Sequence, residues 1–265
     1  MEYVDYHVHS NNSFDGKFKI IDMCKRAATL GIAEICFTEH FSIDPKDVSY
    51  NVLNYYKYSE EINAAREKLK DKIIIKKGLE IGEPYILKKN LEDEVKKMNL
   101  DFIIGSIHNI NSLKLRLSMR NKDKKYVYSD YFDEILKMVG NSDIDIVGHL
   151  DLIKRYAYDL YGNYKFNDYK EILEEILEKV IANNIGIEVN TSGFRNKVGE
   201  TYPSMDILKL YKNLGGKIIT IGSDSHDLDN IGNNYFTVTK MLNEIGFKYI
   251  YKYEKRKKTA IKIES

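Results

Sequence analysis

Seven short apolar runs alternate with helix-like segments along most of the chain. The runs span residues 3–8, 32–38, 73–80, 102–107, 144–147, 186–190 and 217–221. Between them, the pattern indicates helices at 20–30, 53–69, 86–98, 131–139, 169–183 and 204–214. Strands that alternate with helices are typical of parallel βαβ units. We therefore predict an α/β barrel that is one unit short of the eightfold form, with the C-terminal ends of its strands on one face.

The length and charge of the chain limit what it can be. Its 265 residues suit one barrel-like domain with a large core, and we expect a single domain over residues 1–265. Lys and Arg number 41 against 40 Asp and Glu, a formal net charge of +1, which argues against a protein that coats nucleic acid.

The end of the chain carries a helical pattern at 238–245 and then a segment, 248–262, that reads as a hairpin or a trailing strand. The basic run at 255–258 lies in this segment. We interpret it as a solvated turn and expect no nucleic-acid partner.

The first residues contain neither a basic region nor an apolar core of the kind that signal peptides have. No apolar run reaches the roughly 18 residues that a membrane span requires. The two cysteines, Cys24 and Cys36, are not in a Cys-x-x-Cys arrangement, and we read them as reduced thiols of the core. We therefore expect a cytoplasmic protein without a membrane partner.

The histidines are placed unusually. His7 and His9 are two residues apart in the first strand, so both side chains face the same way and can clamp a metal ion. Taken alone, this pair is equally compatible with a surface strand. However, the other four of the six histidines each follow an apolar run, and they are His40, His108, His149 and His226. Barrel enzymes assemble their active sites at the C-terminal ends of successive strands in this way.

Three carboxylates occupy comparable positions: Asp15 in the loop after the first strand, Glu80 at the end of the third, and Asp224 after the seventh. Taken singly, Glu80 reads as a surface residue and Asp224 as a turn residue. Together with six histidines they make nine potential ligands of the type that zinc, manganese or iron prefers. Nine groups exceed the needs of one ion, so we expect more than one.

These segments together resemble the PHP (polymerase and histidinol phosphatase) superfamily. The matching segments are His7-Val8-His9-Ser10, Thr38-Glu39-His40, Gly78-Leu79-Glu80, Gly105-Ser106-Ile107-His108, Gly148-His149 and Gly222-Ser223-Asp224-Ser225-His226. The resemblance implies a distorted (β/α)7 barrel with a trinuclear metal centre of two to three divalent transition-metal ions. It implies one ion held by His7, His9, Glu80 and Asp224, a second by Glu80, His108 and His149, and a third by Asp15, His40 and His226. Some relatives have a histidine where this chain has Asp15.

Within that superfamily, the chain is most similar to the monofunctional histidinol-phosphate phosphatases. The similarity rests on the segments 148–155 and 188–195, each of which brings an arginine, Arg155 or Arg195, into a loop beyond a strand end. A guanidinium there can grip phosphate oxygens. The resemblance implies a phosphomonoesterase that hydrolyses L-histidinol phosphate in histidine biosynthesis by attack of a metal-activated hydroxide, with His40, Asp224 and His226 as catalytic residues.

Three alternatives remain open at this point. A 3′-5′ exonuclease of the same superfamily would use the same ligands, although the chain has no evident basic groove. A phosphoesterase for a nucleotide or another small phosphate differs only in substrate. A structural metal module is the non-enzymatic alternative, but structural zinc sites are usually closed and rich in cysteine.

Overall fold

The computed structural model describes residues 2–263, and its centre is a seven-stranded parallel sheet. The strand order is β1-β2-β3-β4-β7-β8-β9, so each strand pairs with the next one along the main sheet. The bounds are β1 (Val4–Val8), β2 (Glu34–Phe41), β3 (Ile74–Gly82), β4 (Phe102–Ser106), β7 (Ile146–Val147), β8 (Gly186–Asn190) and β9 (Ile219–Gly222). The predicted seven parallel strands are confirmed.

The sheet curls until its two edge strands nearly meet. Val8 of β1 pairs in parallel with Ser225, just beyond β9. The amide of His9 donates to the Ser225 carbonyl at 2.8 Å, and the amide of Asp224 donates to the His7 carbonyl at 2.8 Å. The barrel is therefore closed at the C-terminal ends of its strands by the backbone of the residues that carry the predicted ligands.

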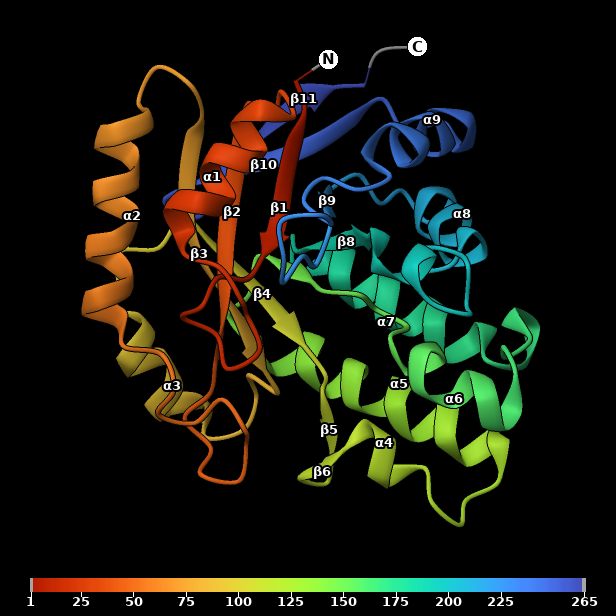
Figure 1. Ribbon diagram of the computed structural model, residues 1–265. Helices are drawn as coiled ribbons and strands as arrows, with labels where there is room; N and C mark the ends of the chain where they lie inside the picture. Colours follow the sequence, from red (N-terminus) through yellow and green to blue (C-terminus); the bar gives the residue numbers. More distant parts are fainter. Residues whose placement is uncertain (1, 264–265) are drawn as a thin grey trace.

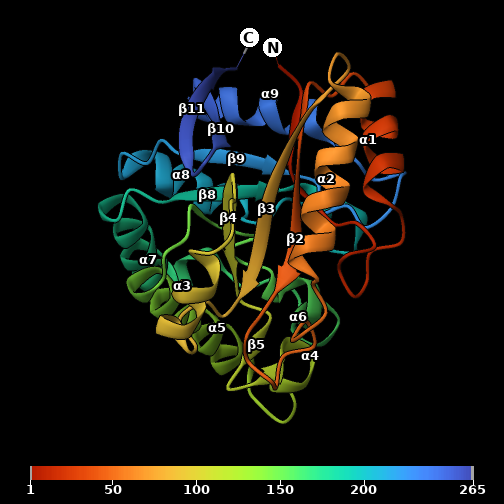
Figure 2. The same ribbon diagram turned by 90° about the vertical axis from the view of Figure 1, so that its left-hand side faces the viewer.

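Helices cover the outside of the barrel, with α1 and α2 against β1 to β3 and α5, α7 and α8 around the other side (Figures 1 and 2). Asn54 caps α2 by accepting a hydrogen bond from the amide of Lys57, and Gly31, with a φ of 78°, follows the end of α1. The helices are α1 (Ile20–Thr29), α2 (Tyr55–Leu69), α3 (Lys88–Val95), α4 (Leu115–Ser118), α5 (Lys124–Asn141), α6 (Ile153–Tyr161), α7 (Lys170–Ala182), α8 (Met205–Asn213), α9 (Tyr235–Ile245) and the short 3-10 helices η1 (Phe166–Asp168) and η2 (Thr191–Arg195).

Several local features differ from the predictions. The helix expected at 131–139 is the longer α5, because its first turns also bury Val127 and Tyr128. The hairpin β5 (Asn109–Ile110) to β6 (Leu113–Lys114) was not foreseen, and neither was α6. Arg155 therefore lies on a helix, and Arg195 on η2, where the sequence suggested loops.

The segment 248–262 is the hairpin of β10 (Tyr249–Glu254) and β11 (Lys257–Lys262). Figures 1 and 2 place it beside the two termini, at the end opposite the β5–β6 hairpin. Arg256 in its turn pairs with Asp145 at 2.8 Å and with Asp143 at 2.9 Å, just before β7 begins. Part of the basic run therefore fastens this hairpin to the N-terminal end of the barrel.

Among residues 2–263, no helix combines the length and the apolar character that crossing a membrane requires.

Candidate metal centre

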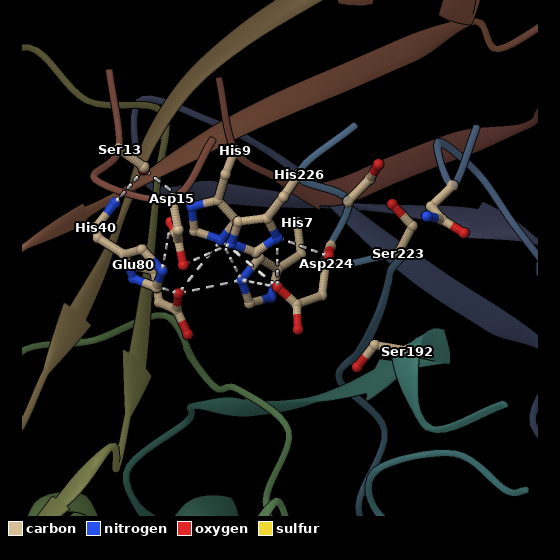
Figure 3. Close-up of polar contacts among 12 residues, drawn as sticks. His7, His9, Ser13, Asp15, His40, Glu80, Ser192, Ser223, Asp224 and His226 are labelled. Atoms are coloured by element: carbon tan, nitrogen blue, oxygen red, sulfur yellow. Dashed lines mark hydrogen bonds and ion pairs between the residues drawn. The ribbon is translucent and has the colours of Figure 1, made fainter. Parts of the chain in front are cut away.

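All nine predicted ligands meet at the C-terminal ends of the strands. Figure 3 shows most of them pointing toward one another from β1, β2, β3 and the segment after β9. His7, His40 and Glu80 lie within strands, whereas the others follow strand ends directly or, for Asp15, after a short loop. The donor atoms of eight of the nine, all but Asp15, form four overlapping groups. Within each group, all atoms lie within 4.8 Å of one another: His9, His40 and His226; His7, His9 and Asp224; His7, Glu80 and His149; His40, Glu80 and His108.

Glu80 is at the centre of this cluster and is completely buried. Its Oε1 lies 2.8 Å from Nε2 of His149 and 3.2 Å from Nε2 of His108. The Ser106 hydroxyl donates to the same oxygen at 2.6 Å. Oε1 of Glu80 thus faces His108 and His149, the predicted ligands that follow β4 and β7.

The other oxygen of Glu80 faces different histidines. Oε2 lies 3.0 Å from Nδ1 of His40, 3.3 Å from Nε2 of His7 and 3.4 Å from Nε2 of His9. It is buried, yet none of these contacts has hydrogen-bond geometry. A buried carboxylate oxygen without a donor is costly unless a cation balances it. Glu80 therefore has the arrangement of a carboxylate that bridges two cations.

The imidazoles of His7 and His9 also fit a shared cation. Their Nε2 atoms lie 3.0 Å apart, close to the roughly 3 to 3.4 Å that two nitrogens take on one zinc ion at bond lengths of about 2.0 to 2.1 Å. The Oδ1 of Asp224 lies 3.8 Å from the first nitrogen and 3.7 Å from the second. These three residues present one nitrogen or oxygen each toward a common point.

The proton positions on His9 follow from its neighbours. Its Nδ1 lies 3.1 Å from the Ser13 hydroxyl, which donates its own hydrogen to Glu39 at 2.5 Å. The hydroxyl can then only accept, so Nδ1 of His9 carries the proton and Nε2 keeps its lone pair for a metal. Burial raises the pKa of Glu39 to about 7, although Ser10 and Ser13 donate to it. Glu39 therefore supports His9 through Ser13.

The electrostatics of the cluster differ from one predicted ligand to the next. Burial opposes charge on Glu80, but the surrounding imidazoles, His7 foremost, outweigh it and hold its pKa well below the ordinary value. Burial and two neighbouring imidazoles lower the pKa of His9 well below its usual range. Around His40, burial is outweighed by Glu80 and Asp15, and its pKa rises to about 10. At His7, too, burial is outweighed, and Glu188 and Glu80 raise the pKa well above the ordinary value. Glu80 and His9 are thus in the forms that bind divalent ions, whereas His7 and His40 release a proton when they bind metal.

The cluster opens to solvent at Asp15, His226 and His108. Asp15 has 39% of its side chain exposed, whereas Glu80 has none. Oδ2 of Asp15 lies 3.3 Å from Nε2 of His226, and Oδ1 lies 3.6 Å from Nε2 of His40. A ligand from solvent reaches the cluster from this side.

A cavity of about 320 Å³ extends from this opening, within the size range of small-ligand sites. Metal ligands from the cluster form one part of its wall, and Arg155, Tyr156 and Arg116 form another. Asp47 also lines it, held by donors from Asn109 at 2.8 Å and from the Ser49 amide at 2.8 Å. The cavity thus combines a buried ligand cluster, cationic groups and one additional carboxylate.

Arg195 is placed differently from Arg155. Its guanidinium donates to the carbonyls of Ser223 and Asp224 at 2.7 and 3.0 Å. Its contact with a substrate phosphate remains a prediction. Asp151 accepts a hydrogen bond from Tyr164 at 2.9 Å and pairs with Lys154 at 2.9 Å, so it anchors α6.

Sequence reasoning did not find four further side chains of the site. Ser13, Ser106 and Glu188 each bond to a ligand or to its partner, and Asp47 reaches the cavity from the loop after β2. The spacing of Glu188 and Asn190 on one strand was the available signal, since i and i+2 share a face.

The chain is similar to several known proteins. Residues 5–192 match the model of the PHP domain. Histidinol-phosphatase of Lactococcus lactis subsp. lactis is 35% identical over 232 residues, 85% of each chain. A probable histidinol-phosphatase of Clostridium acetobutylicum is 32% identical over 255 residues, 95% of this chain and 97% of the relative. The crystal structure of the Lactococcus lactis histidinol phosphate phosphatase, with zinc, L-histidinol and phosphate, superposes with a TM-score of 0.90 at 30% identity, covering 97% of this chain and 99% of that one.

Proposed function

Because the chain belongs to the PHP domain family, we propose that it is a metal-dependent histidinol-phosphatase, which hydrolyses L-histidinol phosphate to L-histidinol and phosphate in histidine biosynthesis. The observation that carries the proposal is Glu80, whose two oxygens face different histidines beside a cavity of substrate size. Relatives with histidinol-phosphatase names match most of the chain, which supports the choice of substrate.

The proposed cofactor is a set of two to three divalent ions, zinc, manganese or iron. His7, His9, Glu80 and Asp224 are assigned to one ion, Glu80, His108 and His149 to a second, and Asp15, His40 and His226 to a third. The two-sided contacts of Glu80 support its bridging role. Such ions lower the pKa of bound water toward neutrality and neutralise phosphoryl oxygens.

The protein's own side chains orient the phosphate. Arg155 lines the cavity next to the cluster, where its guanidinium can hold phosphoryl oxygens that point away from the ions. His40, Asp224 and His226 act as catalytic residues through the ions they hold, and Asp15 completes the solvent-facing side. Arg195 is proposed as a second phosphate ligand, from its place beside Asp224.

Asp47 is proposed to recognise the rest of the substrate. L-histidinol carries an ammonium group, which calls for a carboxylate. Four carboxylates line the cavity: Asp15, Glu80 and Asp224 belong to the ligand cluster, and Asp47 is the fourth. Asn109 and Ser49 already hold the Asp47 side chain in place. Little conformational entropy is therefore lost when it binds the substrate.

We further propose that residues 1–265 form one domain and that the enzyme works in the cytoplasm. The hairpin supports the first point, because the amide of Tyr253 in β10 donates to the Tyr6 hydroxyl in β1 at 2.7 Å. Cys24 and Cys36 are buried free thiols, the state expected in a reducing compartment.

Metal removal tests the proposal. Phosphate release from L-histidinol phosphate should disappear after dialysis against a chelator and return when zinc, manganese or iron is added back. Elemental analysis of the active protein should find two to three ions per chain. A metal-free protein that remains active, or an active one with fewer than two ions per chain, would refute the multinuclear mechanism.

A further inference from the structure

Glu188 of β8 is a completely buried carboxylate that lies outside the ligand cluster but touches it on two sides. Its Oε1 lies 2.6 Å from Nδ1 of His7. Its Oε2 accepts hydrogen bonds from the amide of His149 at 2.8 Å and from the side-chain amide of Asn190 at 3.0 Å. The Glu188 side chain therefore contacts two predicted metal ligands, His7 on β1 and His149 just after β7.

Two glycines leave the space that this carboxylate occupies. A Cβ at Gly222 would lie 2.2 Å from Glu188 Oε1 and 2.4 Å from the Cβ of His7, and both distances are impossible. A Cβ at Gly148 would lie 3.6 Å from Oε2 and 2.7 Å from the Ser106 hydroxyl. These glycines precede Ser223-Asp224 and His149 in the sequence, so the segments that supply ligands also make room for Glu188.

The hydrogen bonds determine which nitrogen of His7 carries a proton. The groups that face Oε2, a backbone N–H and a side-chain NH₂, are permanent donors, so Glu188 accepts on that side. An ionised carboxylate has no hydrogen to give on the other side either, and Nδ1 of His7 must therefore donate to Oε1. In the neutral ring, Nε2 then keeps its lone pair and points toward the Nε2 of His9 and the Oε2 of Glu80, at 3.0 and 3.3 Å.

We propose that Glu188 is a positioning residue of the metal centre: it selects the His7 tautomer whose Nε2 binds metal and ties the backbone of His149 to the same point. The inference rests on the proposed function, because it requires the cluster to bind metal. Carboxylates that orient metal-bound histidines typically change metal affinity by about 10- to 100-fold. Asn190 lies 3.5 Å from the same Nδ1, so the carboxylate is the nearer partner.

Glu188→Gln separates tautomer selection from simple packing, because glutamine has the same shape. Its oxygen must face the two donors, from His149 and Asn190, which places its NH₂ against Nδ1 of His7. Nδ1 must then accept, the proton moves to Nε2, and Nε2 can no longer bind metal. The reversed orientation places the NH₂ against two donors, which leaves all of them without acceptors.

The matched control is Glu34→Gln. Glu34 is an equally buried carboxylate at the start of β2, where it accepts from the Tyr6 hydroxyl, far along the barrel from the ligands. Both variants remove one buried charge from a strand, but only Glu188→Gln changes the partner of a ligand.

The test uses the full chain with zinc as the probe. Zinc bound per chain is measured by elemental analysis across buffered free-zinc concentrations, and proton positions are read from ¹H–¹⁵N spectra of the histidine rings in zinc-loaded protein. We expect wild-type His7 to be protonated on Nδ1 and zinc-bound through Nε2. In Glu188→Gln, zinc affinity should fall about 10- to 100-fold and His7 should be protonated on Nε2. Glu34→Gln should keep wild-type affinity.

Zinc affinity within about twofold of wild type in a folded Glu188→Gln variant would overturn the inference. If that variant does not fold, the spectrum of the zinc-loaded wild-type protein is the test. Zinc bound through Nδ1 of His7 in that spectrum would overturn the inference. Wild-type protein that binds zinc with the expected tautomer but does not hydrolyse L-histidinol phosphate would refute the proposed function and leave the role of Glu188 standing.

Discussion

Arg195 holds the backbone of Asp224: one guanidinium nitrogen donates to the Asp224 carbonyl at 3.0 Å and the other to the Ser223 carbonyl at 2.7 Å. Asp224 has a φ of 53°, a left-handed conformation that costs a non-glycine residue about 1 to 3 kcal/mol. On its other side, its amide donates to the His7 carbonyl at 2.8 Å. The arginine and β1 together hold a predicted metal ligand in a strained conformation.

Arg195→Ala should therefore weaken metal binding as well as catalysis. Removing both hydrogen bonds lets Asp224 relax away from the cluster, and we expect zinc affinity to fall about tenfold. The measurement is zinc bound per chain against free zinc, with Lys197→Ala as control, because Lys197 is an exposed cation nearby that pairs with Asp159. Unchanged zinc affinity with reduced turnover would instead assign Arg195 to phosphate binding alone.

Arg155→Ala should reduce catalysis without reducing metal content. Arg155 lines the cavity from the first turn of α6, outside the ligand cluster. Losing a charge-assisted hydrogen bond to phosphate costs about 1.5 to 3 kcal/mol, which is about a 10- to 150-fold loss in kcat/KM.

Arg120→Ala, which removes an exposed arginine after α4, is the control for this variant. Wild-type kcat/KM in Arg155→Ala would exclude Arg155 from the phosphate site.

Asp47→Asn should lower kcat/KM mainly for substrates that carry an ammonium group. If Asp47 pairs with the ammonium of L-histidinol phosphate, kcat/KM for that substrate should fall about tenfold. The value for p-nitrophenyl phosphate, which lacks an ammonium group, should change by less than about threefold. Steady-state kinetics with both substrates make the comparison.

Asp44→Asn provides the control, since Asp44 lies in the same loop and accepts from the Lys46 amide. Equal losses for both substrates in Asp47→Asn would show that Asp47 shapes the cavity and does not recognise the amine.

The cluster of predicted ligands could be inferred from the sequence because the ligands lie near the ends of strands, and a parallel barrel places these strand ends on one face. His7 and His9 share a face by their spacing. Glu80 lies near the end of β3 and His149 follows the end of β7, so a parallel barrel brings these two within 2.8 Å of each other although 69 residues separate them. No knowledge of loop conformation is needed for this step.

The other residues of the site could not be predicted, because their positions depend on packing between segments that are distant in the sequence. Glu188 is one of several polar residues on buried strands, and only the close approach of Gly222 and His7 reveals its role. Asp47 reaches the cavity through the conformation of an irregular loop. Arg195 lies a few residues beyond its strand, as Arg155 does, yet the 3-10 turn of η2 directs it to the backbone of Asp224.

The central claim is the substrate, and one comparison tests it most directly. The metal-loaded enzyme is assayed for kcat/KM with L-histidinol phosphate, other small phosphomonoesters, nucleotides and single-stranded DNA. We predict that L-histidinol phosphate exceeds each of the others by at least tenfold, a difference of about 1.4 kcal/mol in transition-state binding. A tenfold or greater preference for any other substrate would contradict the proposed function, even with the barrel and its metal centre intact.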